Sequence, residues 1–276
     1  MAATLEQTIR TNYDLLPVGE RKLADVVLAM GCELGAWSAT ELAESAGVSK
    51  ATASRLVRRL GFSDYQAMRQ QARASGSPLA ALRGAHAKQG TLGRHLDHDV
   101  ACLTYTLEGI SADLARRAVE VLAQAARIWV VGFRNSYALA LYGRELLVQV
   151  KPDVRLLPVP GQTIAEELSA LGAGDAVLAL GFRRRTPGFA AVLRIAAQEK
   201  ARTILIGDPS LGDLGKHAEV TLRCLSRGSG LFDTYVAPVS LLNYLCSRVA
   251  VALGEAAQQR LRRSEVLHDR FGDFGL

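Results

Sequence analysis

The pattern of apolar positions changes along the chain. In the first 75 residues apolar side chains recur at the three-, four- and seven-residue spacing of amphipathic helices, as at Leu23, Val26, Val27 and Met30. This part carries almost no strand signal. We therefore predict an all-α domain over residues 1–77.

After residue 110 short apolar runs alternate with helical stretches. Continuously apolar runs suit strands that are buried on both faces of a parallel sheet. The predicted strands are 127–133, 154–159, 176–182, 203–207 and 220–225, and the predicted helices are 136–150, 164–171, 188–200 and 233–253. A charged C-terminal segment follows the last of these helices. This pattern predicts a three-layer α/β domain with a five-stranded parallel sheet over residues 109–276.

A segment of linker character separates the two patterns. Residues 74–78 read Ala-Ser-Gly-Ser-Pro, which mixes helix breakers with small polar residues. We assign residues 78–108 to a linker and a connecting helix, with the helix starting near residue 100. The histidines of this segment lack the pairing with a carboxylate that a helical zinc site shows, so we interpret His86, His95 and His98 as solvated linker residues.

Residues 38–60 have the features of two helices joined by a tight turn. Ser38 and Glu41 have the spacing of a capping box, which starts a helix. Gly47 supplies the left-handed backbone that ends this helix, and Ser49 caps the next one. The buried stripe of the second helix is Ala53, Leu56, Val57 and Leu60. These signals predict a helix-turn-helix.

The outward face of the second helix carries short hydroxyl side chains followed by arginines. Small polar groups read base edges in the major groove, and guanidinium groups reach phosphates. The candidate DNA-binding residues are Ser49, Lys50, Thr52, Ser54, Arg55, Arg58 and Arg59. A helical hairpin with a merely solvated basic face is the alternative. The coincidence of caps, glycine turn and basic face favours DNA binding.

The distribution of charge agrees with a polyanionic partner. The chain has a formal net charge of +6, a value too small to be decisive for 276 residues. Residues 1–48 hold three basic and seven acidic side chains, whereas residues 49–73 hold six basic side chains against Asp64 alone. Positive charge is thus concentrated in the segment that contains the predicted recognition helix.

The runs PVGERKLADVVL and ELAESAGVSKATASRLVRRLGFSDYQAMR resemble the N-terminal domain of the RpiR (MurR/RpiR) family of bacterial regulators. In that family a helix-turn-helix precedes a sugar isomerase (SIS) domain, and the pattern over residues 111–253 has the element order of an SIS domain. The stretch Gly61 to Tyr65 is the most family-specific piece. The resemblance implies DNA contact by Ser49, Lys50, Thr52, Ser54 and Arg55.

The resemblance also implies a ligand site. SIS-like domains are similar to flavodoxin-type sheets of strand order 2-1-3-4-5, whose crevice opens where strands 1 and 3 part. The turns at 132–136 and 181–186 would present backbone N–H groups and positive helix ends there, so we expect an anion. The candidate ligand-binding residues are Arg134, Asn135, Ser136, Arg183, Arg184, Arg185 and Thr186. Ser226, Ser229 and Asp233 are weaker candidates.

The second turn departs from the family pattern. Sugar-phosphate-binding SIS domains carry a loop of the form S-x-S-G-x-T, of which this chain keeps Thr186 and replaces the serines with three arginines. Arginine favours a charged ligand that is bound by side chains. Three adjacent arginines cannot all point into one pocket, so at least one is expected to be solvated or structural. An exposed loop, or pairing with acids across a dimer interface, is the alternative for all three.

The resulting hypothesis is a cytoplasmic bacterial transcriptional regulator that forms a homodimer or homotetramer. Its partners are double-stranded DNA with a palindromic operator and a small anionic effector, either a sugar phosphate, a sugar acid or another carboxylate. We expect no cofactor or metal, because Cys32, Cys102, Cys224 and Cys246 lie far apart. We expect no membrane contact, because no apolar run approaches the roughly 18 to 20 residues of a span.

Two other functions compete with this hypothesis. One is an SIS-fold sugar-phosphate isomerase or lyase with a fused helical domain. Glu145, Glu166 and Glu167 are available as acids or bases, but no histidine stands in either turn, so we do not expect an enzyme. The other is a DNA-binding protein whose α/β domain only dimerises.

Overall fold

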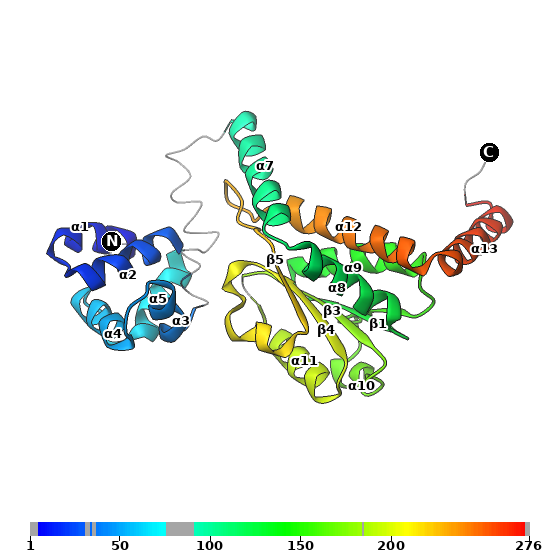
Figure 1. The fold of residues 1–276 in the computed structure, drawn as a ribbon, viewed down its shortest axis with the longest axis horizontal. Coiled ribbons are helices and arrows are strands. Elements are labelled where there is room, and N and C mark those ends of the chain that lie inside the picture. Colours follow the sequence, from blue (N-terminus) through cyan, green and yellow to red (C-terminus); the bar gives the residue numbers. More distant parts are fainter. Residues whose placement is uncertain (1–4, 31–33, 35–36, 76–90, 184, 274–276) are drawn as a thin grey trace. The chain divides into compact units, whose positions relative to one another are not determined.

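The computed structural model describes residues 5–30, 34, 37–75, 91–183 and 185–273 (Figure 1). The chain divides into two compact units. One contains residues 1–96 with 209–212 and 227–233, and the other contains residues 97–208, 213–226 and 234–276. Cys32, His86, the predicted breaker Pro78 and the candidate ligand residue Arg184 lie outside the described residues.

The described residues of the helical unit between 5 and 75 are all-α, as predicted. Its elements are α1 (Leu5–Asn12), the 3-10 turn η1 (Tyr13–Leu15), α2 (Val18–Met30), α3 (Ala39–Ser45), α4 (Lys50–Arg59) and α5 (Tyr65–Ser75). Side chains from each of the five α-helices form one core, in which Ile9, Leu23, Leu42, Leu56 and Met68 are fully buried. The predicted apolar stripes are therefore the faces on which these helices pack.

The second unit contains a five-stranded sheet in which every neighbouring pair is parallel. Its strands are β1 (Ile128–Gly132), β2 (Val154–Leu157), β3 (Ala176–Gly181), β4 (Arg202–Gly207) and β5 (Val220–Arg223). The strand order is β2-β1-β3-β4-β5, which confirms the predicted 2-1-3-4-5. All residues of β1 and β3 are buried, as the continuous apolar runs indicated.

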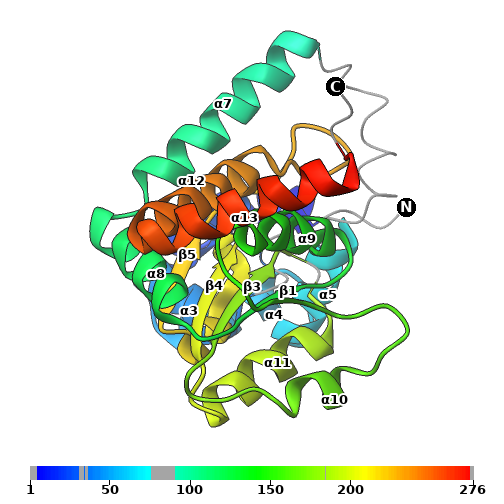
Figure 2. The same ribbon diagram turned by 90° about the vertical axis from the view of Figure 1, so that its right-hand side faces the viewer.

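Helices cover both faces of the sheet (Figure 2). On one face α8 (Ala112–Gln124) and α9 (Asn135–Val148) lie against the strands, with α12 (Val236–Leu253) packed on both helices. The other face carries α10 (Ile164–Leu168) and α11 (Pro187–Gln198). The segment η3 (Pro209–His217) connects β4 to β5. This is the predicted three-layer arrangement.

Within the described residues, α12 alone is long and apolar enough to be a candidate membrane span. Its inward side chains belong to the core of the α/β unit, and those with less than 2% exposure are Ala237, Leu241, Leu242, Leu245 and Val249. The core helix of a globular domain passes the same test of length and composition, so the length and apolar composition of α12 are only weak evidence for a membrane-spanning helix.

Two helical regions differ from the sequence prediction. The connecting helix α7 (Leu92–Glu108) begins eight residues before the predicted start at residue 100, after Thr91, whose Oγ1 accepts a hydrogen bond from the Arg94 N–H at 3.3 Å. His95 and His98 therefore lie on a helix and not in a linker. The N-terminal half of α7 is mostly exposed, so burial imposes no clear apolar periodicity on it.

The end of the chain also differs. The predicted helix 233–253 begins at Val236, so Asp233 lies outside it and is not its N-cap. The charged C-terminal segment forms a further helix, α13 (Glu255–Phe271), which Gly254 separates from α12 by a backbone φ of 56°. Among the described residues, no group of three or more His, Cys, Asp or Glu side chains is arranged to hold a metal ion.

Candidate functional sites

The helix-turn-helix has the local geometry that its sequence predicts. The Ser38 Oγ accepts a hydrogen bond from the Glu41 N–H at 3.2 Å, and the Ser38 N–H donates to the Glu41 Oε2 at 2.7 Å. Gly47 has a φ of +62°, and the Ser49 Oγ accepts from the Thr52 N–H at 3.2 Å. The capping box, the left-handed turn and the second N-cap are all confirmed.

The recognition helix α4 presents most of its candidate DNA-binding side chains to solvent. Its buried side chains Ala53, Leu56 and Val57 belong to the helical core, as predicted. Ser49, Lys50, Ser54, Arg55, Arg58 and Arg59 are exposed and Thr52 is half-buried. The Thr52 Oγ1 lies 3.0 Å from the Ser49 Oγ and accepts a hydrogen bond from the Arg55 Nη2 at 3.2 Å. This chain of hydrogen bonds fixes three candidate side chains on one face of α4.

Arg59 differs from the other basic residues of α4. Its Nε lies 2.8 Å from the Glu20 Oε2 on α2, and the Glu20 side chain is only 4% exposed. A buried carboxylate needs a cationic partner. Arg59 therefore ties α4 to α2, a structural role that the sequence pattern did not reveal.

In the α/β unit, the candidate ligand turns meet at one edge of the sheet. Gly132 at the end of β1 pairs with Leu180, and Gly181 at the end of β3 pairs with Gly207 at the end of β4. The segments that start at Phe133, Phe182 and Asp208 therefore leave the sheet side by side. We call this side the carboxyl edge.

Close packing of helix on strand shapes this edge. A Cβ on Gly132 would lie 2.2 Å from the Ser136 carbonyl oxygen, and one on Gly181 would lie 2.4 Å from the Phe189 ring. Any larger residue would therefore push away the first turn of α9 or α11. The two glycines hold the N-terminal turns of these helices against the ends of β1 and β3.

Neither of these helices is capped by a side chain. Arg134, the N-cap of α9, is exposed and has a φ of +56°, and Thr186, the N-cap of α11, makes no side-chain capping bond. Asn135 is exposed, whereas Ser136 is 5% exposed and its N–H donates to the Phe133 carbonyl oxygen. Helix N-termini present N–H groups and partial positive charge. Two such ends without side-chain caps at one edge favour an anion.

The arginines of the second turn do not share one environment. The Arg185 side chain is 10% exposed, and its Nη2 lies 3.0 Å from the Asp208 Oδ1, whose side chain is 2% exposed. Its Nε and Nη1 donate to the carbonyl oxygens of Gly181 and Arg183 at 3.2 and 3.0 Å. Burial lowers the pKa of the Arg185 guanidinium, and the Asp208 carboxylate acts in the opposite direction.

Arg183 contributes to the same structure through its backbone. Its φ is +38°, and its N–H donates to the Asp208 Oδ2. Asp208 thus fixes the turn through both the backbone of Arg183 and the guanidinium of Arg185. The candidate Arg185 serves the shape of the turn, which is the structural role expected for at least one of the three arginines.

Two hydroxyl groups near this edge are buried without a hydrogen-bond partner, the Thr186 Oγ1 and the Ser226 Oγ. Ser226 follows the end of β5 by three residues and is 1% exposed. A buried hydroxyl without a partner costs about 1–3 kcal/mol, so native proteins contain few of them. Such groups are expected where a ligand completes the site.

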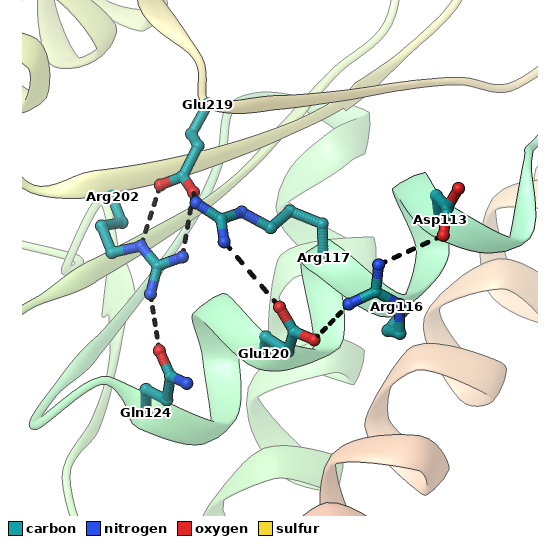
Figure 3. Close-up of polar contacts among 7 residues, drawn as sticks. All are labelled: Asp113, Arg116, Arg117, Glu120, Gln124, Arg202 and Glu219. Atoms are coloured by element: carbon teal, nitrogen blue, oxygen red, sulfur yellow. Dashed lines mark hydrogen bonds and ion pairs between the residues drawn. The ribbon is translucent and has the colours of Figure 1, made fainter.

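The opposite, amino edge of the sheet is closed by ion pairs. The Arg202 guanidinium donates to both Glu219 oxygens at 2.8 and 2.9 Å and to the Gln124 Oε1 at 2.9 Å (Figure 3). Arg117 approaches the same Glu219 carboxylate at 2.6 Å. The hydrogen bonds from Arg202 lower the pKa of the Glu219 carboxyl, against the effect of its partial burial. These side chains bind one another within the chain.

Glu145, Glu166 and Glu167, the acids or bases that the sequence offered for an enzyme, lie on α9 and α10 and not in the turns after β1 and β3. Glu145 lies ten residues into α9, about 15 Å along its axis from Asn135, and is paired with Arg144 at 2.6 Å. Glu166 is exposed and Glu167 half-buried on α10. Among the described residues, the histidines lie on α7, η3 and α13 and not in the turns after β1 and β3.

Comparisons with known proteins identify both units. Residues 3–77 match the helix-turn-helix domain of the rpiR family, and residues 121–248 match the SIS domain. The chain belongs to the RpiR family. This is the family that the recognition helix and its continuation indicated.

Curated relatives of this RpiR-family chain are transcriptional regulators. It is 26% identical over 215 residues to the HTH-type transcriptional regulator HexR of Pseudomonas aeruginosa, covering 74% of this chain and 73% of that protein. It is 23% identical over 207 residues to HexR of Escherichia coli, covering 72% and 71%. The chain is a transcriptional regulator of the RpiR and HexR type with an SIS domain.

Solved structures show the same folds. The sugar isomerase domain of an RpiR transcription factor from Sphaerobacter thermophilus is 25% identical, with a TM-score of 0.60 over 64% of this chain and 99% of that one. The NanR protein of Vibrio vulnificus, solved in complex with ManNAc-6P, has a TM-score of 0.69 over 97% and 99% at 18% identity. The likeness to NanR concerns the fold alone.

Sequence reasoning missed Asp208 at the carboxyl edge of this RpiR-family protein and gave little weight to Ser226. Asp208 directly follows the predicted strand 203–207, so the rule that ligand turns follow parallel strands would have drawn attention to it. No local signal marks the Ser226 hydroxyl as unpartnered. That property depends on which groups the fold packs around it.

Proposed function

We propose that this regulator binds operator DNA through α4 and changes its operator affinity when a small anionic metabolite binds at the carboxyl edge of the SIS sheet. The metabolite is a sugar phosphate, a sugar acid or another carboxylate. The observation that carries the proposal is the pair of helix N-termini without side-chain caps, those of α9 and α11, beside the unpartnered Thr186 hydroxyl.

The effector would contact the carboxyl edge through groups that the fold leaves available. Arg134 and Asn135 are exposed beside the first turn of α9, and the Thr186 Oγ1 lacks a partner at the start of α11. The backbones of Arg183 and Ser136 shape the two turns, because their N–H groups donate to the Asp208 Oδ2 and the Phe133 carbonyl oxygen. Arg184 remains a candidate, and Arg185 shapes the second turn. The ManNAc-6P bound to the structurally similar NanR supports a phosphorylated sugar as the first compound to test.

DNA binding would use Ser49, Lys50, Thr52, Ser54, Arg55 and Arg58. The proposed domain boundaries are residues 1–77 for the DNA-binding domain, 78–108 for the connection and 109–276 for the effector domain. We further propose a cytoplasmic homodimer or homotetramer whose paired recognition helices meet half-sites about 34 Å apart on a palindromic operator. The effector shifts operator affinity only if it binds one arrangement of the helices better than the other.

A pair of arginine variants tests the DNA interface. Operator duplexes are first selected from a random library with the full chain, and binding is then followed by fluorescence anisotropy. Arg55→Ala removes an exposed guanidinium and should weaken operator binding at least tenfold, or about 1.4 kcal/mol, without lowering the melting temperature. Arg59→Ala leaves the buried Glu20 carboxylate unpaired and should lower the melting temperature instead. Equal operator affinity of Arg55→Ala and the wild type would remove Arg55 from the interface.

A panel of sugar phosphates, sugar acids and carboxylates tests the effector half of the proposal. A ligand that binds the folded chain raises its melting temperature by mass action. The same compound should change operator affinity in the anisotropy assay. Conversion of a sugar phosphate by the purified chain would instead support an SIS-fold isomerase or lyase.

A further inference from the structure

The C-terminal helix α13 makes few contacts within its own chain. Of its 17 residues only Ala257 is buried. The Arg260 Nε donates a hydrogen bond to the Val148 carbonyl oxygen at 2.9 Å, which ties the second turn of α13 to the end of α9. Beyond this point α13 projects from the rest of the α/β unit (Figure 1).

One face of α13 nevertheless has the pattern of a packing surface. Ala257, Leu261, Ser264, Leu267 and Phe271 follow one another at spacings of three and four residues and lie on one side of the helix. Leu261, Leu267 and Phe271 are 36%, 41% and 78% exposed. Helices of this length owe most of their stability in water to the packing of such a face. We therefore expect the apolar face of α13 to pack against another protein surface.

The residues along this face are arranged symmetrically about Ser264, so the face is complementary to a second, antiparallel copy of itself. Ala257 and Phe271 lie seven residues before and after Ser264, and Leu261 and Leu267 lie three residues before and after it. A two-fold axis through Ser264 would pair two antiparallel copies of α13. The small Ala257 of each copy would then face the large Phe271 of the other, and the two Ser264 residues would let the helix axes approach closely.

We propose that α13 packs antiparallel against α13 of a second copy of this chain. Its composition favours this occupant over a strongly acidic one such as duplex DNA or an anionic lipid surface, because α13 carries four arginines and three carboxylates.

The available apolar area is sufficient for such an interface. The stripe on α13 exposes roughly 300 Å² per chain if a full Leu or Phe surface is taken as about 200 Å². Two copies would therefore bury roughly 600 Å² of apolar surface. Because about 60% of a protein interface is apolar, this corresponds to about 1,000 Å² in total, the area that a specific interface requires.

Two neighbouring residues of α13 supply a matched test. Leu267 lies on the proposed interface, whereas Val266, which is 49% exposed, lies on the opposite side of the helix from Ala257. Both side chains are exposed within one chain, so neither Leu267→Glu nor Val266→Glu should disturb its core. The mass of each full-length variant is measured by sedimentation equilibrium at about 10 µM, without DNA or ligand. Failure of this test would therefore leave the proposed effector site untouched.

The expected result is that Val266→Glu keeps the wild-type mass and Leu267→Glu sediments at half of it, with association weakened at least tenfold. Three results would overturn the proposal: a wild type that is monomeric at this concentration, a Leu267→Glu variant with the wild-type mass, or dissociation of Val266→Glu as well. The first would show that α13 does not pair with a second copy and would also count against the proposed homodimer or homotetramer. The second would show that the copies associate through another surface, and the third that the proposed face is not selective.

Discussion

The two edges of the SIS sheet use arginine in opposite ways. At the amino edge Arg127 donates two hydrogen bonds of 2.9 Å to the buried Asp175 carboxylate, and Arg202 donates two of 2.8 and 2.9 Å to the partly exposed Glu219 carboxylate. At the carboxyl edge Arg134 is exposed at the N-cap of α9 with a positive φ, and the turn after β3 holds the buried Thr186 hydroxyl, which has no partner. The amino edge is thus complete within the chain, whereas the carboxyl edge has groups that a ligand could complete.

The hydrogen bonds that Arg127 and Arg202 donate to Asp175 and Glu219 stabilise the protonated guanidinium groups at the amino edge. They raise the pKa of Arg127 and Arg202 above the ordinary value for arginine, against the opposing effect of burial. Burial is instead the largest influence on Arg185, whose pKa is lowered. Arg185 therefore lies at the carboxyl edge but is paired with a carboxylate, like the arginines of the amino edge. It belongs to the side chains that hold the fold together and not to those that a ligand can contact.

The largest expected effect comes from Arg185→Ala. This substitution leaves the buried Asp208 carboxylate without its guanidinium, which should cost about 3–5 kcal/mol of folding free energy. Urea unfolding is followed by the fluorescence of Trp129, which is fully buried in β1, in a Trp37→Phe background.

Arg194→Ala is the control for this variant, because Arg194 is an exposed arginine on α11. It should change stability by no more than about 0.5 kcal/mol. If Arg185→Ala kept full stability and lost only the effector response, Arg185 would belong to the ligand site and not to the structure of the turn.

For Thr186→Val we expect a smaller change in folding free energy, and this change should stabilise the chain. Because the Thr186 Oγ1 is buried without a partner, replacing the hydroxyl with a methyl group should stabilise the ligand-free chain by about 1 kcal/mol. The same variant should bind its effector at least tenfold more weakly. Urea unfolding and calorimetric titration measure the two effects.

Thr203→Val provides the comparison from the amino end of β4. The Thr203 hydroxyl is also buried but donates to the Ala201 carbonyl oxygen at 3.4 Å, so its removal should leave stability unchanged or lower it by up to about 1 kcal/mol. A loss of stability in Thr186→Val, equal to that in Thr203→Val, would mean that the Thr186 hydroxyl is satisfied without a ligand.

The parts of the structure that sequence reasoning predicted depend on local signals. The boundaries of α3 and α4 follow from Ser38, Gly47 and Ser49, each of which acts within about three residues of itself. The strands follow from runs that the sheet buries on both faces. Such signals need no knowledge of distant contacts.

The remainder depends on contacts that a linear pattern does not contain. The sequence treats Arg134 and Arg185 alike, but Arg185 meets Asp208, which lies 23 residues away on the next strand end. The pairing of Arg59 with Glu20 spans 39 residues. The helix α13 was missed because its apolar side chains are interspersed with charges and remain exposed within one chain.

The most direct test of the account compares one arginine from each edge. Isothermal titration of the full chain with the sugar phosphate that gives the largest melting shift is repeated for Arg134→Ala and Arg202→Ala. The account predicts affinity at least tenfold below wild type for Arg134→Ala and wild-type affinity for Arg202→Ala. Equal weakening by both substitutions, or no binding by any compound of the panel to the wild type, would contradict it.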